Sequence, residues 1–261
     1  MKPMESKVAL VTGAASGIGR AAATLLADWG AAVAAVDMQE DRAGQVADEI
    51  NRAGGDAIAI RADVSRVDDV RNAMAKVEDR WDRLDVLVAN AGVNGVWAPL
   101  DKLKPEEFDE TISINLRGTF LSVKYALPLL KKRGGSIVIT SSVNGNRVFS
   151  NTGATAYSCS KAGQVAFMKM AALELAEHDI RVNAICPGPV STNIGKRTQK
   201  RGTEEAGPAA EYPEGTVPLT GGESGKPEEV GRLIRFLASG ESSFISGTEI
   251  YIDGTESLLQ G

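Results

Sequence analysis

Residues 8–19 read VALVTGAASGIG, and this stretch decides the fold. Residues 8–11 form an apolar run typical of a buried strand, and residues 17–29 have the pattern of a helix. The turn between them lacks the strict G-x-G-x-x-G spacing of a dinucleotide fingerprint. Its glycines nevertheless allow a tight turn and let a pyrophosphate approach the backbone, while the start of the helix offers free N–H groups. The stretch predicts a strand, a phosphate-binding turn and a helix.

The same alternation continues along the chain. Further strands are expected at 32–36, 57–60, 84–88, 136–140, 180–185 and 249–252. Helices are expected at 40–53, 66–81, 105–131, 154–178 and 227–239, the third of them interrupted or kinked at Pro128. Apolar strands separated by helices indicate a parallel sheet that is covered on both faces. We therefore predict an α/β, doubly wound Rossmann fold with a seven-stranded parallel sheet, in a single dinucleotide-binding and catalytic domain over 1–261.

The charge balance and the rare residues narrow the function classes. The 261 residues include 29 Lys and Arg and 34 Asp and Glu, a net charge of −5, which disfavours a nucleic-acid partner. The sequence contains neither an apolar run of about 20 residues nor a signal peptide, so we expect a cytoplasmic protein without a membrane partner. The single histidine, His178, and two cysteines, Cys159 and Cys186, exclude a Cys/His zinc site. No metal is expected, and these three residues are expected to be structural.

Asp37 ends the second predicted strand, 18 residues beyond Gly19. A carboxylate at this position can accept hydrogen bonds from both hydroxyls of an adenosine ribose and would repel a 2′-phosphate. Neither Ser16 nor Met38 supplies a cation to hold such a phosphate. The sequence therefore predicts NAD rather than NADP.

Tyr157 and Lys161 are four residues apart on a predicted helix and so share a face. A phenol has a pKa near 10, and lowering it by about three units requires roughly 4 kcal/mol. An ammonium about 5 Å away contributes on the order of 3 kcal/mol at an effective dielectric constant of 20. The oxidised nicotinamide adds a second positive charge, so we expect the two charges together to suffice for the phenol to exchange a proton with a carbonyl or alcohol oxygen. Ser142, at the end of a predicted strand, is placed to hydrogen-bond the same oxygen.

Together these motifs resemble those of the short-chain dehydrogenase/reductase family, and the resemblance covers essentially the whole chain. The matching segments are Thr12–Gly19, Asp63-Val64, Asn90-Ala91-Gly92, Asn115, Ser142, Tyr157-Ser158-Cys159-Ser160-Lys161 and Pro187–Thr192. The resemblance implies that hydride passes between a substrate carbon and a nicotinamide, because no side chain can carry it. It also implies a catalytic set of Asn115, Ser142, Tyr157 and Lys161. In the family, the counterpart of Lys161 holds the nicotinamide ribose and that of Asn115 positions a water in a proton relay.

The expected cofactor site combines the glycine turn with the ends of the other strands. Its residues are Gly13, Ser16, Gly17, Ile18, Gly19, Asp37, Asp63, Val64, Asn90, Ala91, Gly92, Tyr157, Lys161, Pro187, Gly188, Val190 and Thr192.

The substrate is expected to meet Ser142, Asn144 and Tyr157. Ser142 and Tyr157 are 15 positions apart, two more than the commonest family spacing, so Ser141 is the alternative to Ser142. The extra length falls in 144–151, a loop that borders the substrate pocket in the family. With Asn94 and Trp97, this loop is expected to offer amide and guanidinium groups to a polar substrate.

Residues 191–226 are rich in glycine and proline, which predicts either a lid over the active site or a disordered insertion. The segment also carries a basic cluster, defined here as Lys196, Arg197, Lys200 and Arg201. This cluster is either a solvated face of the lid or a docking site for an acidic carrier protein.

The preferred function is an NAD-dependent oxidoreductase acting on a small-molecule secondary alcohol or ketone, with a polar or polyol-like substrate as one candidate class. The alternatives are a 3-oxoacyl carrier-protein reductase and a catalytically silent cofactor-binding protein. A homotetramer is expected, because the family buries its last strand and preceding helix in symmetric contacts. Leu258 and Leu259 in the tail are expected to pack at a subunit contact.

Overall fold

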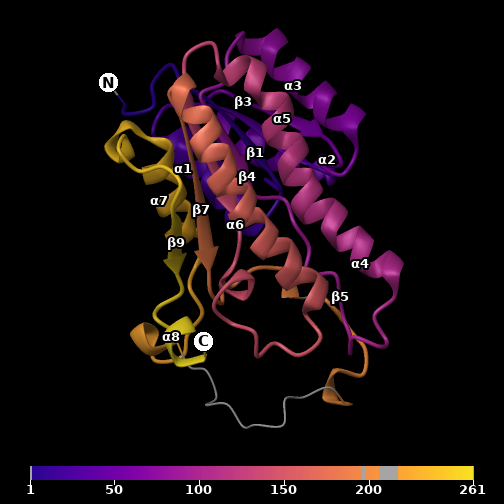
Figure 1. Ribbon diagram of the computed structural model, residues 1–261. Helices are drawn as coiled ribbons and strands as arrows, with labels where there is room; N and C mark the ends of the chain where they lie inside the picture. The colour runs from indigo at the N-terminus through magenta and orange to yellow at the C-terminus, as the bar shows by residue number, and fades with distance from the viewer. Residues whose placement is uncertain (1, 196–197, 206–216, 261) are drawn as a thin grey trace.

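The computed structural model describes residues 2–195, 198–205 and 217–260, and its centre is a seven-stranded parallel sheet (Figure 1). The strand order is β3-β2-β1-β4-β6-β7-β9, which confirms the predicted doubly wound Rossmann fold. The strands are β1 (Val8–Thr12), β2 (Ala32–Asp37), β3 (Ala57–Arg61), β4 (Val86–Ala89), β6 (Gly135–Thr140), β7 (Ile180–Pro187) and β9 (Glu249–Ile252). The chain runs outward from β1 to β3 and then returns to place β4 on the other side of β1. This reversal opens a crevice at the carboxyl ends of the strands, where ligands bind in open α/β sheets.

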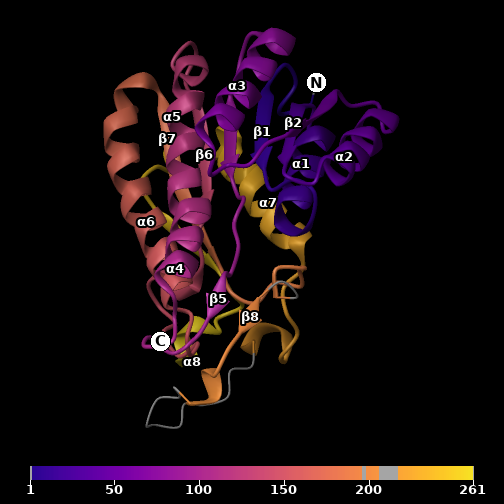
Figure 2. The same cartoon turned by 90° about the vertical axis from the view of Figure 1, so that its right-hand side faces the viewer.

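Helices cover both faces of the sheet (Figures 1 and 2). On one face, α1, α2 and α7 bury side chains such as Leu26, Ile50 and Ile234 against the strands. On the other, α3, α5 and α6 contribute residues such as Val77 and Met168 to a second core. The helices are α1 (Gly17–Asp28), α2 (Glu40–Arg52), α3 (Val67–Trp81), α4 (Pro105–Ile112), α5 (Gly118–Leu130), α6 (Thr155–Leu175), α7 (Pro227–Ala238) and α8 (Ser257–Gln260).

The predicted helix over 105–131 is interrupted at a different place from the one expected. Helix α5 continues through Pro128 to Leu130, so the prediction of a break there was wrong. The interruption is instead a π-helical turn, η1 (Ser113–Arg117), between α4 and α5. A π turn inside a helix is rare and often marks a functional site.

Two short strands were not predicted. β5 (Val96–Trp97) and β8 (Gln199–Lys200) pair in parallel and form a separate two-stranded sheet. A strand of only two residues is too short to show the alternation by which strands are recognised in a sequence. Among the described residues, no helix is both long and apolar enough to span a bilayer.

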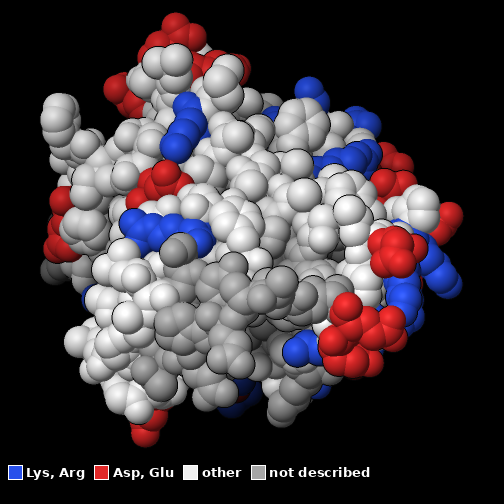
Figure 3. Space-filling view, turned by 60° about the horizontal axis from the view of Figure 1, so that its bottom comes forward, with Lys and Arg blue, Asp and Glu red and all other residues white. Residues whose placement is uncertain are grey.

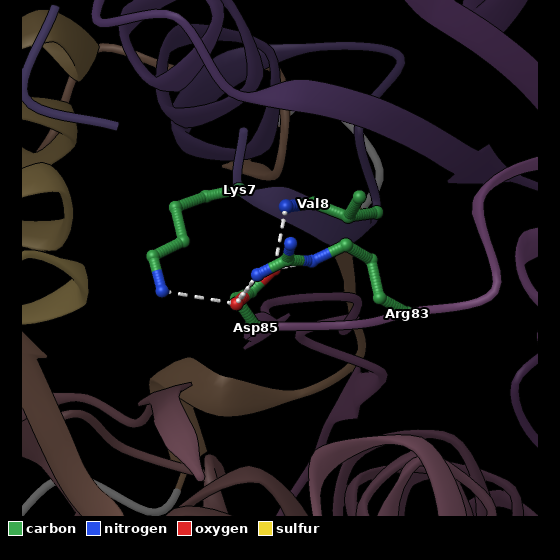
Figure 4. A network of polar contacts seen from close by, with 4 residues as sticks. All are labelled: Lys7, Val8, Arg83 and Asp85. Atoms are coloured by element: carbon green, nitrogen blue, oxygen red, sulfur yellow. Dashed lines mark hydrogen bonds and ion pairs between the residues drawn. The ribbon is translucent and has the colours of Figure 1, made fainter. Parts of the chain in front are cut away.

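The amino end of the sheet is held by a compact polar network around Asp85 (Figure 4). Its carboxylate accepts hydrogen bonds from Arg83 at 2.6 and 2.9 Å, from Lys7 Nζ at 3.1 Å and from the Val8 N–H at 2.9 Å. Burial acts to raise the pKa of Asp85, but these partners together hold it below its usual range. The network therefore ties the start of β1 to the start of β4, at the end of the sheet opposite the crevice.

Candidate active site

A cavity of about 520 Å³ opens at the carboxyl ends of the strands and brings together most of the predicted site residues. Those that line it are Gly13, Ser16, Gly17, Ile18, Asp37, Asp63, Val64, Asn90, Ala91, Gly92, Ser142, Tyr157, Lys161, Pro187, Gly188, Val190 and Thr192. Three predicted residues, Gly19, Asn115 and Asn144, do not line the cavity.

The glycine turn after β1 is fixed to the end of β4. Thr12 Oγ1 accepts hydrogen bonds from the N–H groups of Asn90 and Ala91, both at 3.0 Å, and Asn90 Nδ2 donates to the Thr12 carbonyl at 3.0 Å. Gly13 has φ +68°, and a Cβ there would lie 2.9 Å from the Ala91 Cα. Only glycine fits at position 13 without displacing backbone.

Gly19 acts behind the cavity rather than in its wall. A Cβ at this position would overlap the Gly13 carbonyl oxygen and lie 2.6 Å from Asn90 Nδ2. Gly19 therefore allows α1 to approach the turn closely, which brings the amino end of the helix to the cavity.

Asp37 is positioned by backbone amides at the end of β2. Its carboxylate accepts hydrogen bonds from the N–H groups of Ala15 at 3.1 Å and Gln39 at 2.9 Å. Among the described residues that line the cavity, Lys161 is the only lysine or arginine, whereas the lining includes four carboxylates, those of Asp37, Asp63, Glu107 and Glu110.

The predicted catalytic pair lies in the first two turns of α6, and both side chains are buried. Lys161 Nζ donates to the Thr140 carbonyl at 2.8 Å and lies 5.6 Å from the centroid of the Tyr157 ring. The hydroxyl of Ser141 is committed to the Lys161 carbonyl at 2.9 Å. Ser142 Oγ accepts the Asn144 N–H at 3.2 Å and also hydrogen-bonds with Tyr157, the expected proton donor. This geometry favours Ser142 over Ser141.

Lys161 alone does not lower the pKa of Tyr157. Burial raises the pKa of Tyr157, and the hydrogen bond with Ser142 opposes the shift without reversing it. Burial also lowers the pKa of Lys161 to about 8, so the ammonium stays mostly protonated at pH 7. Removal of water from around the phenol is the largest cause of the raised pKa of Tyr157.

Asn115 lies in the π turn η1 and is completely buried. Its side-chain oxygen accepts the Val93 N–H at 2.8 Å, and its Nδ2 donates to the Val93 carbonyl and to Ser160 Oγ, both at 2.9 Å. Asn115 therefore braces the segment that follows Gly92 in the cavity wall.

The loop 144–151 does not contribute to the cavity wall as expected. Asn144 is buried and accepts a hydrogen bond from Asn151 Nδ2 at 2.9 Å. Arg147 stacks on Tyr251, with its guanidinium carbon 3.3 Å from the ring centroid, and Asn146 hydrogen-bonds to Glu249. These groups hold the loop against β9 and the adjoining chain.

The predicted lid is partly anchored to the loop after β4. Asn94 Nδ2 donates to Thr198 Oγ1 at 2.8 Å, and the Arg201 N–H donates to the Trp97 carbonyl at 2.9 Å. The Arg201 guanidinium also binds both carboxylate oxygens of Glu107, each at 2.8 Å. We call this set of contacts the lid latch.

Within the basic cluster, the described members are already engaged. Arg201 belongs to the lid latch, and Lys200 Nζ lies 5.2 Å from the centroid of the Trp97 ring. Lys196 and Arg197 lie outside the described residues. Acidic and basic side chains are intermixed around the visible rim of this face (Figure 3).

Comparisons with known proteins cover almost the whole chain. A family model described as enoyl-(acyl carrier protein) reductase matches residues 13–255. The chain is 40% identical over 252 residues to the 3-oxoacyl-[acyl-carrier-protein] reductase of Thermotoga maritima, covering 96% of this chain and 98% of the relative. The chain belongs to the short-chain dehydrogenase/reductase family.

Two solved members of this short-chain dehydrogenase/reductase family support the assignment. A crystal structure of a 3-ketoacyl-ACP reductase from Sinorhizobium meliloti 1021 is 51% identical, with a TM-score of 0.93 and coverage of 97% of this chain and 99% of that chain. A 3-ketoacyl-(acyl-carrier-protein) reductase from Brucella melitensis, complexed with NADH, is 31% identical with a TM-score of 0.85, and the match covers 97% and 99%. The chain is thus a nicotinamide-dependent oxidoreductase that acts on CH–OH or keto groups.

The residues of this short-chain dehydrogenase/reductase fit a dinucleotide. A side chain at Gly13 would collide with Ala91, so the backbone alone forms the turn beneath the cavity. Asp37 and the amino end of α1 then offer a carboxylate for ribose hydroxyls and N–H groups for a pyrophosphate.

Several cavity residues were missed by the sequence reasoning. Asn193, Ile194 and Gln199 come from the lid, and Glu107, Glu110, Thr111 and Ile114 come from α4 and η1. The i, i+3, i+4, i+7 spacing of the second group was a readable sign of one helical face. No comparable pattern marks the lid residues.

The remaining special residues lie outside the cavity. Cys159 is exposed, and Cys186 is buried at the end of β7, where burial raises its pKa to about 11. His178 follows α6 in a short 3₁₀ turn, with Nε2 3.5 Å from Glu177. The placements of Cys186 and His178 agree with structural roles, whereas the exposed Cys159 does not pack in the core as expected.

Proposed function

We propose that this short-chain dehydrogenase/reductase uses NAD rather than NADP and interconverts a polar secondary alcohol and its ketone. The observation that carries the cofactor choice is Asp37, held by two amides in a cavity whose described wall has only Lys161 as a basic residue. A 2′-phosphate beside Asp37 would meet a carboxylate and no cation.

When bound, the nicotinamide supplies the hydride acceptor or donor. Tyr157 donates or accepts the proton at the substrate oxygen, and Ser142 hydrogen-bonds the same oxygen. Lys161 donates to the Thr140 carbonyl and lies near the Tyr157 ring. Its positive charge there favours the phenolate form of Tyr157, which accepts the proton of the alcohol.

The preference for a polar substrate rests on the carboxamides in the cavity wall. Val96 and Gln199 are register partners in the β5–β8 pair, and both line the cavity. Asn94 and Asn193 add two more carboxamides. Such groups donate and accept hydrogen bonds without charge, which suits hydroxyl groups next to the reacting carbon.

Steady-state kinetics with NAD⁺ and NADP⁺ tests the cofactor proposal. NAD⁺ should be preferred at least tenfold in kcat/KM, and equal efficiencies would refute the proposal. The double substitution Asp37→Ala with Met38→Arg should move the preference toward NADP⁺, because it replaces the repelling carboxylate and adds a cation.

The names of the relatives favour a second candidate, a 3-oxoacyl carrier-protein reductase. Use of NAD does not argue against it, because a relative of that name is complexed with NADH. The engaged state of Lys200 and Arg201 does argue against a free docking surface on the lid. Turnover of a 3-oxoacyl thioester should therefore be weaker than that of polyols or cyclic alcohols. The reverse order would select the second candidate.

The alternative of a catalytically silent cofactor-binding protein is set aside, because the chain belongs to a family of oxidoreductases and carries the complete set of Asn115, Ser142, Tyr157 and Lys161.

We further propose one catalytic domain covered by the lid 191–226 and assembled as a homotetramer; the cytoplasmic location remains a prediction. Leu258 and Leu259 are exposed in the isolated chain, as expected for a tail that a neighbouring subunit covers. Light scattering at micromolar concentration should give four chains per particle, and a monomer would refute the assembly.

A further inference from the structure

Gln164 is a fully buried amide that the sequence analysis did not single out. It lies on α6, one helical turn after Lys161, and is 0% exposed. Its Nε2 donates to the Asn115 carbonyl at 3.0 Å and to Thr119 Oγ1 at 2.7 Å. Helix α6 runs alongside α4 and α5 (Figures 1 and 2), so this amide joins α6 to the π turn between those two helices.

The bond to Asn115 occurs where the regular helix is interrupted. A π turn breaks the i→i+4 hydrogen-bond pattern of the flanking helices. Here the Asn115 carbonyl takes two side-chain donors, Gln164 Nε2 at 3.0 Å and Thr119 Oγ1 at 2.7 Å. Because a carbonyl oxygen has two lone pairs, it can accept hydrogen bonds from both donors.

The side chain of Asn115 is equally committed. Both Nδ2 hydrogens are used, one on the Val93 carbonyl and one on Ser160 Oγ, and Ser160 in turn donates to the Tyr157 carbonyl at 2.7 Å. Asn115 thus connects two walls of the cavity, the segment around Val93 and the helical turn that bears Tyr157.

The amide of Gln164 has a cost that an apolar residue would avoid. Its Oε1 is buried and has no hydrogen-bond partner among the described residues. An unpaired buried carbonyl destabilises the folded state, whereas methionine has nearly the same shape and no such group. A functional role of the Nε2 contacts would explain why a destabilising amide occupies this position.

We propose that Gln164 is a positioning residue for hydride and proton transfer. It fixes the π turn, through which Asn115 holds Val93 and Ser160, and thereby sets the position of the Tyr157 turn against the cavity wall. The proposal rests on the proposed function for its kinetic test, and its structural part is independent of it.

Gln164→Met is the first test, with single-turnover hydride transfer followed by NADH absorbance. The rate should fall about tenfold, while the Kd for NAD⁺ stays within twofold and the melting temperature is unchanged or higher. Met168→Leu, one turn further along α6 in the apolar core, is the packing control and should leave all three values close to wild type. An unchanged rate, or a rate loss that follows losses of stability and cofactor binding, would overturn the proposal.

Gln164→Glu provides a pH-dependent rescue. A protonated buried carboxyl can donate to the Asn115 carbonyl as the amide does, whereas the carboxylate cannot. The ratio of variant to wild-type rate should therefore fall as pH rises. Taking the ratio corrects for Lys161 and Tyr157, the titratable groups one and two turns away that both proteins share. A flat ratio would contradict the role.

Hydrogen exchange separates failure of this proposal from failure of the proposed function. The amides of 113–119 should exchange faster in Gln164→Met than in wild type, whether or not a substrate is known. Unchanged exchange overturns the proposal for Gln164. Absence of wild-type turnover with any alcohol or ketone overturns the proposed function alone.

Discussion

The cofactor side of the cavity and its substrate side are built by different means. On the cofactor side, the ends of β1 and β4 are joined by three hydrogen bonds of 3.0 Å, and a side chain on either Gly13 or Gly19 would collide with backbone. On the substrate side, the described part of the lid is held by a two-residue strand and by exposed ion pairs. Around Gly195, Gly221 and Gly222 in the lid, no atom of the residues that the structure describes lies within 4 Å of an added Cβ.

This difference separates a wall that is fixed by packing from a cover that is held by solvent-exposed contacts. Buried contacts between backbone atoms cannot yield without moving whole strands, whereas exposed ion pairs contribute about 1 kcal/mol or less. Changes in the wall should therefore abolish function, and changes in the cover should only modulate it.

The largest effect is expected at Tyr157, in the fixed wall. Tyr157→Phe keeps the ring and removes the acidic proton, so kcat should fall by about 10² to 10⁴, the usual contribution of a positioned acid or base. The Kd for NAD⁺, measured by calorimetry, should be nearly unchanged. Cys159→Ala, two residues along the same helix and exposed, is the control and should keep activity within a few fold. Retention of most activity in Tyr157→Phe would refute the proton-transfer role.

The next largest effect tests the wall without touching chemistry. Gly19→Ala places a methyl group against the Gly13 carbonyl and Asn90, so binding of NAD⁺ should weaken at least tenfold and the melting temperature should drop. Gly44→Ala is the matched control, because its Cβ would meet no atom within 4 Å in the middle of α2. The control should gain up to about 1 kcal/mol of stability from helix propensity. Equal behaviour of the two variants would show that the wall tolerates movement.

The buried charge of Lys161 should lower the free energy of unfolding of the protein at neutral pH, compared with a neutral side chain at the same position. Its pKa is lowered to about 8, so the unfolded chain binds more protons than the native protein between about pH 8 and 10.5, the pKa of an unperturbed lysine. The contribution of Lys161 to the free energy of unfolding therefore rises with pH across this window. Below the window, the cost of burying the charged ammonium is fully present.

Lys161→Met should consequently raise the free energy of unfolding near pH 7 by about 1 to 3 kcal/mol while abolishing turnover. Denaturant unfolding at pH 7 to about 10 measures this, and the difference between the two proteins isolates Lys161 because Cys186 titrates in both. If Lys161→Met were less stable than wild type at pH 7, the favourable contacts of the ammonium would outweigh the cost of its burial, and the prediction would be wrong.

The same contrast explains how much the sequence could predict. The strands, Asp37 and the Tyr157–Lys161 pair were predicted because apolar runs, strand ends and helical spacing are local signals. The β5–β8 pair and the contact of Arg201 with Glu107 join residues about a hundred positions apart, with no periodicity to mark them. The effect of burial on the pKa of Tyr157 was missed because spacing along a helix indicates a nearby charge but not the loss of water around the buried phenol.

The π turn and the commitments of Asn144 and Asn115 were missed for a related reason. Each depends on which side chains from other helices and loops reach a backbone group, as Gln164 reaches the Asn115 carbonyl. Such a contact is decided by packing between elements and leaves no trace in the spacing along one of them.

The smallest effect is expected in the lid latch. Hydrogen bonds from Arg201 and from the Lys104 N–H lower the pKa of Glu107 to about 2, so Glu107 is ionised throughout the range in which enzymes are assayed. The latch should therefore not titrate above about pH 4, and any pH dependence of activity should come from the wall. Glu107→Gln keeps the shape of the side chain and removes the charge that the guanidinium binds.

In ligand-free Glu107→Gln, tryptic cleavage after Lys200 and Arg201 should be about two- to fivefold faster than in wild type, since solvent screens the ion pair and keeps its contribution small. Glu106→Gln, an exposed neighbour in the same first turn of α4, removes the same charge without touching Arg201 and should leave the rate unchanged. NAD⁺ with a substrate analogue should slow cleavage in all three proteins, because closing the lid excludes water from the reaction. If Glu107→Gln were cleaved no faster than Glu106→Gln, the ion pair would not hold the cover, and the β5–β8 pairing would have to do so alone.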